Sequence, residues 1–181
     1  YRPAFCVKAI SFFGNSIGVY RLDLNTGKLT TTLQPSLDSL LSSYAVSFSS
    51  KDKYLTYVHS SNPTDIHIQS IQTRKLEKFS LNGEYSASGL FTWSPDNKKL
   101  VFVAAKQGWQ PYDDTQPQDS VSYFMLDIET GALQHLFDKQ DIYKPIWITN
   151  DKLTLNQLDG DDFLLYDFQS SSFSAITPTP Y

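Results

Sequence analysis

Short apolar stretches of strand length alternate with polar turns along most of this chain. Residues 91–103 form one such unit, in which a polar turn containing Pro95 and Asp96 separates two apolar stretches. Residues 46–58 and 145–155 repeat the layout, each with Asp and then Lys in the turn. Asp and Asn suit such turns because their short side chains bond the local backbone and tolerate left-handed geometry. Each unit therefore predicts two strands joined by a tight turn.

A second kind of hairpin follows each of these units. Residues 17–29 and 123–133 each read as a strand, a glycine-containing turn and a further strand, and residues 66–76 and 164–173 are degenerate copies. Period-2 alternation with turn residues is typical of β-hairpins. Two consecutive hairpins make a four-stranded unit, and such units recur at about the 40–45 residues expected of propeller blades.

The pattern thus predicts an all-β fold, a β-propeller of four-stranded antiparallel blades. The chain contains about four blades, which form either a small complete propeller or part of a larger ring. A partial ring would expose strand edges, through which two copies of the chain could pair. The expected blades cover approximately residues 4–33, 44–81, 90–137 and 144–177.

The composition and net charge of the chain argue against several classes of function. Hydrophobic residues make up 40% and charged residues 19% of the chain, as in globular proteins, and the 14% of aromatic residues favours strands. The formal net charge of -4, without a lysine or arginine stripe, argues against direct nucleic-acid binding. No apolar run approaches the roughly 18 residues of a membrane helix, so we expect no membrane insertion. The single cysteine, Cys6, predicts a small buried hydrophobe without a disulfide partner or zinc motif.

The third unit resembles a known repeat. Its sequence TWSPDNKKLVFV, followed by YFMLDIETGAL, is similar to the PD40 repeat of TolB-like, WD40-like propellers, with the pattern W-S-P-D-G-K-K-I-A-F and then I-Y-V-M-D-L-x-T-G. Asn97 replaces the usual turn glycine, and Asn is the next-best residue for positive φ. The other units match more weakly, because Ser50 and Asn150 stand where the repeat has proline. The resemblance covers residues 17–177 and concerns fold more than function.

The resemblance implies that the b–c and d–a loops share one face of the propeller and that this face binds a protein partner or a small ligand. The most individual of these loops is an insertion between Lys106 and Ser120. A long loop with aromatic and carboxylate side chains suits recognition. The alternative is a solvated loop with Trp109 packed on its own blade. Our candidate contact residues are Trp109, Tyr112, Asp113, Asp114, Asp119 and, from a second acidic loop, Asp161.

The acidic loop itself, residues 159–162, admits two interpretations. Its carboxylates suggest calcium, but they lack the D-x-[DN]-x-[DN]-G spacing and a following Glu. Asp-Gly is also the usual type I′ hairpin turn, which is the interpretation we favour. The sequence predicts no metal and no cofactor.

Catalytic motifs are weak. Residues 14–18 match G-x-S-x-G, but a nucleophile elbow needs a helix after it and a strand pattern follows here. His59, His67 and His135 lack metal-ligand spacing, and we interpret them as structural or surface residues. We therefore predict no catalytic residues and no enzyme activity in this segment.

These observations predict a non-enzymatic binding or sensor module for protein interactions. The resemblance suggests one context, the periplasmic sensory domain of a membrane-anchored transcriptional regulator; the alternative location is cytoplasmic. A second hypothesis is the substrate-gating propeller of a prolyl-oligopeptidase-like serine peptidase, with its catalytic residues elsewhere. A third is a purely structural set of blades.

Overall fold

The computed structural model describes residues 6–13, 16–23, 26–33, 43–50, 53–59, 61–106, 121–158, 160 and 162–176. These residues form strands joined by turns and contain no α-helix. The first half of the chain supplies β1 (Cys6–Phe13), β2 (Ser16–Asp23), β3 (Leu29–Leu33), β4 (Ser43–Phe48), β5 (Tyr54–His59), β6 (Asn62–Ser70) and β7 (Leu76–Ser80). The second half supplies β8 (Tyr85–Trp93), β9 (Lys99–Lys106), β10 (Val121–Asp127), β11 (Leu133–Lys139), β12 (Tyr143–Thr149), β13 (Lys152–Gln157), β14 (Phe163–Asp167) and β15 (Ser172–Ala175).

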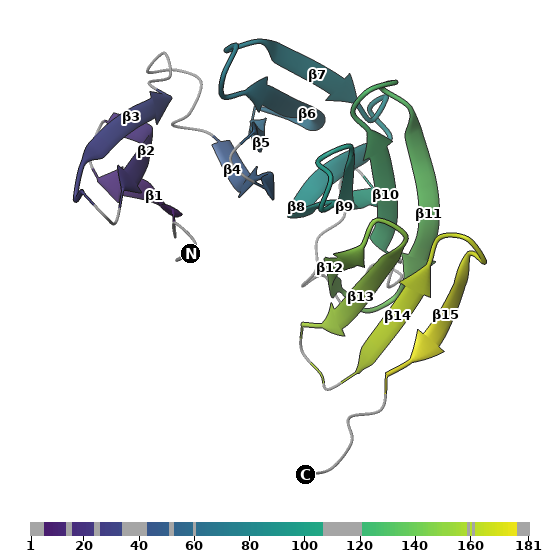
Figure 1. Ribbon diagram of the computed structural model, residues 1–181. Helices are drawn as coiled ribbons and strands as arrows, with labels where there is room; N and C mark the ends of the chain where they lie inside the picture. Colours follow the sequence, from purple (N-terminus) through teal and green to yellow (C-terminus); the bar gives the residue numbers. More distant parts are fainter. Residues whose placement is uncertain are drawn as a thin grey trace.

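The strands form four sheets in which sequence neighbours pair antiparallel. β1–β2–β3 is a three-stranded sheet, and β4–β7, β8–β11 and β12–β15 are four-stranded meanders. Figure 1 shows the sheets following one another along an arc, with β4, β8 and β12 on its inner side and β7, β11 and β15 on its outer side. β8 lies against both β4 and β12. This is the arrangement of propeller blades, so the predicted all-β propeller fold is confirmed. We refer to the four sheets as blades one to four.

The turn between the last two strands is built in the same way in blades three and four. In blade three the Asp127 carboxylate accepts hydrogen bonds from the backbone N–H groups of Glu129 and Thr130 and from the Thr130 hydroxyl. In blade four Asp167 accepts the corresponding backbone bonds from Gln169 and Ser170. An aspartate at this position therefore fixes the turn locally, as expected for an Asx turn.

In all four blades, the turn between the last two strands ends in a left-handed residue. Gly27 and Gly131 fill this position in blades one and three, with φ values of 66° and 72°. Arg74 and Ser171 fill it in blades two and four, with φ values of 64° and 50°. Left-handed geometry is unfavourable for residues with a Cβ atom, so these two turns hold strained backbone that the glycine turns avoid.

The turn between the first two strands carries the PD40 signature. In blade three the Ser94 hydroxyl donates to Asp96 at 2.6 Å and accepts from the Lys99 N–H at 2.9 Å. Asn97 has a φ of 62°, which confirms that it replaces the repeat's glycine by adopting the left-handed conformation. Blade two repeats part of the network, because the Tyr54 N–H donates to the Ser49 hydroxyl at 2.8 Å.

The hydrophobic core lies between the blades. Between blades two and three, Val58 and Ile66 pack with Leu100, Phe102 and Phe124 among other buried side chains. Fully buried side chains of this size each stabilise a fold by about 1.5–3 kcal/mol relative to exposure, so the interface between sheets is the main apolar contribution to the fold.

Aromatic side chains join blade three to blade four. The Phe137 ring lies 4.8 Å from Tyr166 and 4.8 Å from Phe173, measured between ring centroids. The indole N–H of Trp147 donates across the interface to the carbonyl of Thr92 at 3.1 Å. The directional bond and the ring contacts together fix how the two blades meet.

The third blade begins at Tyr85, before the boundary at residue 90 that the sequence pattern suggested. The blade ranges expected from the sequence leave residues 82–89 between blades two and three, whereas β8 already covers residues 85–89. Its pairing with β9 shifts register twice around Gly89, which has a φ of 105°, and Leu90 has a φ of 51°. Such bulges interrupt the alternation of side chains. The strand signal before residue 90 was therefore hidden in the sequence.

Candidate functional site

The predicted recognition residues lie outside the described part of the chain. This holds for Trp109, Tyr112, Asp113, Asp114 and Asp119 in the insertion and for Asp161 in the acidic loop. The structure does define where the insertion begins and ends. β9 ends at Lys106 and its antiparallel neighbour β10 begins at Val121, so residues 107–120 connect two adjacent strands at one end of blade three.

This connection is longer than its counterparts in the neighbouring blades. The equivalent connection consists of residues 60–61 in blade two and residues 158–162 in blade four. Blade three thus has 14 residues, numbers 107–120, at a place where the fold needs only two to five. Loops of this length that the fold does not require are commonly functional.

A polar cluster lies where this connection leaves the blade. The Ser122 hydroxyl donates to Asp138 Oδ1 at 2.7 Å, and His135 Nε2 lies 2.8 Å from the same oxygen. Partial burial raises the pKa of Asp138, but the hydrogen bonds from Ser122 and His135 outweigh burial and hold this pKa below its ordinary value. The carboxylate is therefore ionised at neutral pH and about half exposed.

The cluster does not have the geometry of a catalytic triad. In a triad the histidine lies between the serine and the carboxylate and accepts the serine proton. Here Ser122 and His135 both contact Asp138 Oδ1. The arrangement orients a carboxylate and does not activate the Ser122 hydroxyl.

The other histidines have structural contacts. His59 Nδ1 lies 2.6 Å from the Ser61 hydroxyl. The His67 ring is buried and stacks on Tyr57 with a centroid separation of 5.0 Å. Burial lowers the pKa of His67, so its ring is neutral at neutral pH.

The G-x-S-x-G match does not open a helix. Ser16 begins β2, which pairs with β1 from Phe13 and Ser16 onward, so a strand follows the motif as the sequence suggested. Among the described residues no group of three His, Cys, Asp or Glu side chains is arranged to hold a metal ion. In the acidic loop, the Gln157 N–H donates to the Asp162 carbonyl at 3.0 Å, which closes the hairpin between β13 and β14.

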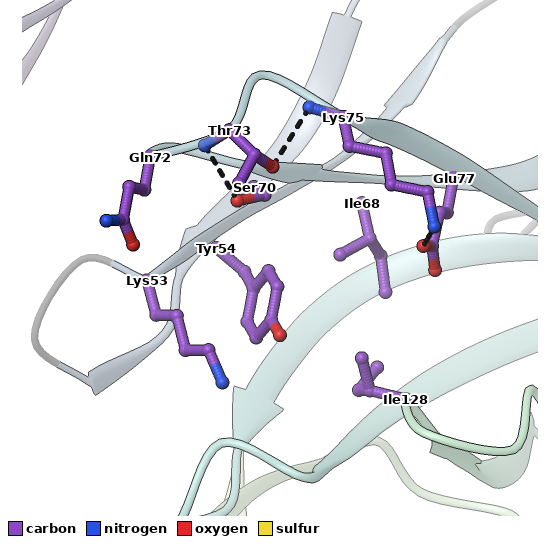
Figure 2. A pocket seen from close by; sticks show the side chains of 9 residues that line it. All are labelled: Lys53, Tyr54, Ile68, Ser70, Gln72, Thr73, Lys75, Glu77 and Ile128. Atoms are coloured by element: carbon purple, nitrogen blue, oxygen red, sulfur yellow. Dashed lines mark hydrogen bonds and ion pairs between the residues drawn. The ribbon is translucent and has the colours of Figure 1, made fainter.

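A pocket of about 280 Å³ lies between blades two and three at the opposite end from the insertion (Figure 2). Tyr54, Ile68 and Ile128 form its apolar part, and Lys53 lies beside them with its ammonium 4.9 Å from the centre of the Tyr54 ring. Polar side chains complete the lining: Ser70, Gln72, Thr73, Lys75 and Glu77.

The sequence did not predict this pocket. Its residues come from the start of β5, from the degenerate hairpin of blade two and from the turn of blade three that contains Ile128. Ile128 is 74 residues from Tyr54, and no motif connects them. The pocket also lies on the turn face, whereas the sequence directed attention to the loop face.

Comparison with known proteins identifies the fold of this chain. No protein-family model and no curated protein sequence matches the chain. Solved structures do match. An oligogalacturonate lyase in complex with manganese has a TM-score of 0.64 and 18% identity, over 88% of this chain and 46% of its own. TolB from Acinetobacter baumannii has a TM-score of 0.64 and 18% identity, over 96% of this chain and 41% of its own.

Peptidases are also among the similar structures. Pyrococcus horikoshii acylaminoacyl peptidase has a TM-score of 0.59 and 14% identity, over 96% of this chain and 30% of its own. The chain therefore spans less than half the length of these proteins. Together with the sheet order, the similarities define the class: the blades have the TolB-like β-propeller fold, as the PD40 resemblance predicted. Within the described residues, no helix has the length and apolar character needed to cross a membrane.

Proposed function

We propose that this chain is a non-catalytic binding module of a TolB-like propeller protein and that it recognises a protein partner through residues 107–120. One observation carries the proposal: blade three has 14 residues where blades two and four make the same connection with two and five. The neighbouring blades show that the fold requires only two to five residues at this place. Binding residues concentrate on loops that a rigid scaffold positions.

The chemistry at the base of the insertion fits recognition. Asp138 presents an ionised, half-exposed carboxylate held by Ser122 and His135. The insertion adds Trp109 and Tyr112, residue types that commonly anchor protein interfaces. Further acidic residues follow in the insertion, so we expect a partner surface with lysine or arginine near an apolar pocket.

The wider context is part of the proposal. The PD40 resemblance suggests a periplasmic sensory domain of a membrane-anchored transcriptional regulator, in which binding shifts a conformational or oligomeric equilibrium. The similarity to acylaminoacyl peptidase over 96% of this chain supports a second candidate, the propeller of a serine peptidase. In that case the insertion would contact substrate or a neighbouring domain.

Site-specific photocrosslinking tests the proposal. A benzoylphenylalanine replaces Tyr112 in one variant and the exposed Gln169, in the turn between β14 and β15 of blade four, in a matched control. In cells of the source organism we expect one defined intermolecular product from position 112, absent from position 169 and reduced by Asp114→Asn. Equal products from both positions, or none from position 112, would contradict the loop proposal. A product within the same polypeptide, joined to a hydrolase domain, would favour the peptidase candidate.

A further inference from the structure

We propose that the pocket between blades two and three binds a carboxylate attached to an apolar group, such as a free peptide C terminus with an apolar last residue. The site lies at the opposite end of the blades from residues 107–120. It is therefore independent of the partner proposed above.

The apolar half of the pocket is built by both blades. The Tyr54 ring stacks on Trp93 of blade three with a centroid separation of 5.3 Å and an interplanar angle of 13°. This stacking holds the Tyr54 ring against the blade interface. Ile68 is almost completely buried beneath the pocket, and Ile128 packs on the same core cluster. These residues give a preformed apolar surface, which favours a branched or straight apolar side chain.

The charged half of the pocket selects an anion. Two lysines and one glutamate line it, which leaves one net positive charge in a chain of net charge -4. Lys75 pairs with Glu77 at 2.6 Å, so its charge is compensated. The Lys53 ammonium lies over the Tyr54 ring, at the edge of the pocket (Figure 2). Among the described residues, no acidic side chain forms a salt bridge with Lys53. The Lys53 ammonium is therefore the group that a ligand carboxylate would meet.

The two halves set the size and shape of the ligand. A volume of about 280 Å³ lies below the usual range for drug-sized molecules and suits one or two amino-acid residues. The Gln72 amide lies on the polar side, where it is available to a ligand peptide group. The Ser70 oxygen accepts from the Thr73 N–H, so Ser70 can offer a ligand only its hydroxyl proton. An apolar side chain on the isoleucines and a carboxylate at Lys53 satisfy both halves at once.

Titration by nuclear magnetic resonance tests this assignment on the full chain. The probes are acetyl-Ala-Ala-Leu with a free carboxylate, the same peptide with a C-terminal amide, and 4-methylvalerate as a free small acid. We expect the free-acid peptide to shift the backbone amide signals of Lys53, Ile68 and Ile128. The amidated peptide should bind up to about fivefold more weakly, the upper end of an exposed ion pair. If the peptide and 4-methylvalerate bind equally, the ligand is a small acid; if the peptide binds more tightly, it is a chain terminus.

Two variants complete the test. Lys53→Gln should weaken the free-acid peptide by about fivefold and leave the amidated peptide unchanged. Lys144→Gln, an exposed lysine on β12, is the matched control and should change neither. The proposal is overturned if the acid and the amide bind alike, if Lys53→Gln has no effect on a folded protein, or if no probe shifts the pocket signals at 10 mM.

Discussion

Replacing Tyr123 by phenylalanine removes one oxygen atom from the interface between blades three and four. The Tyr123 side chain is completely buried. Its hydroxyl donates to the Tyr143 carbonyl at 2.8 Å and accepts from the Tyr143 N–H at 2.7 Å. The hydroxyl thereby joins β10 to the first residue of β12.

The size of the effect follows from these two bonds. A hydrogen bond contributes about 0.5–1.5 kcal/mol net, and a buried group left without a partner costs about 1–3 kcal/mol. Tyr123→Phe loses both bonds and leaves backbone groups of a buried residue unpaired. We therefore expect the free energy of unfolding to fall by about 2–4 kcal/mol.

The pH dependence gives a second, independent readout. Burial raises the pKa of Tyr123 well above the ordinary value of 10.0, although its backbone hydrogen bond opposes the shift. The folded state therefore keeps the proton that the unfolded state releases, and the stability that this confers is lost as the pH rises above about 10. The wild type should lose about 1 kcal/mol more than Tyr123→Phe between pH 10 and pH 11. Tyr57, whose pKa burial also raises, contributes equally to both proteins.

Urea unfolding followed by circular dichroism measures both effects. Tyr85→Phe is the matched control, because Tyr85 is half-buried and its hydroxyl has no hydrogen-bond partner among the described residues. We expect the control to stay within about 0.5 kcal/mol of the wild type. If Tyr123→Phe is equally mild at pH 7, or if its deficit does not shrink at high pH, the hydroxyl bridge does not stabilise the blade interface.

Three further substitutions test the turns and the blade interface by the same unfolding assay. Ser171→Gly should stabilise the chain by up to about 1 kcal/mol, because the left-handed position costs a residue with a Cβ atom about 1–2 kcal/mol. The greater entropy of glycine in the unfolded chain offsets part of this gain. An unchanged or lower unfolding midpoint would show that this turn is unstrained. Trp147→Phe should cost about 1–3 kcal/mol by leaving the Thr92 carbonyl without its indole donor, and a loss below 0.5 kcal/mol would contradict that role. Asp127→Ala should cost about 1 kcal/mol, because three donors lose their acceptor, whereas the exposed Asp151→Ala should be near neutral. Hydrogen bonds from Thr130, opposed by slight burial, lower the pKa of Asp127, so the Asp127 contribution should disappear as the pH falls below about 4, and a pH-independent deficit would argue against it.

Much of the local structure was readable in the sequence because it is made by residues a few positions apart. The left-handed Asn97 and the Asp127 turn both follow from short side chains that bond nearby backbone. The repeat of such turns predicted the blades, with 44 residues from Asp52 to Asp96 and 55 from Asp96 to Asp151, where the insertion lengthens the interval. The candidate residues of the insertion stay a prediction, since Trp109 and its neighbours lie outside the described part of the chain.

Contacts between blades could not be read in the same way. The Gly89 bulge breaks the alternation that marks a strand, so the start of β8 was not visible. The Tyr123 hydroxyl bridge and the bond from Trp147 to Thr92 involve polar groups whose partners follow no local spacing.

The sequence by itself determined the kind of protein: its periodic strands and turns specify four-stranded blades, since backbone hydrogen bonding and turn chemistry act over short distances. Only the tertiary structure decided where a pocket lies. Tyr54 and Ile128 meet because two twisted sheets pack face to face, and such packing depends on the shapes of many side chains together. For the same physical reason, the fold was predictable from a repeat, whereas the pocket at Lys53 was not.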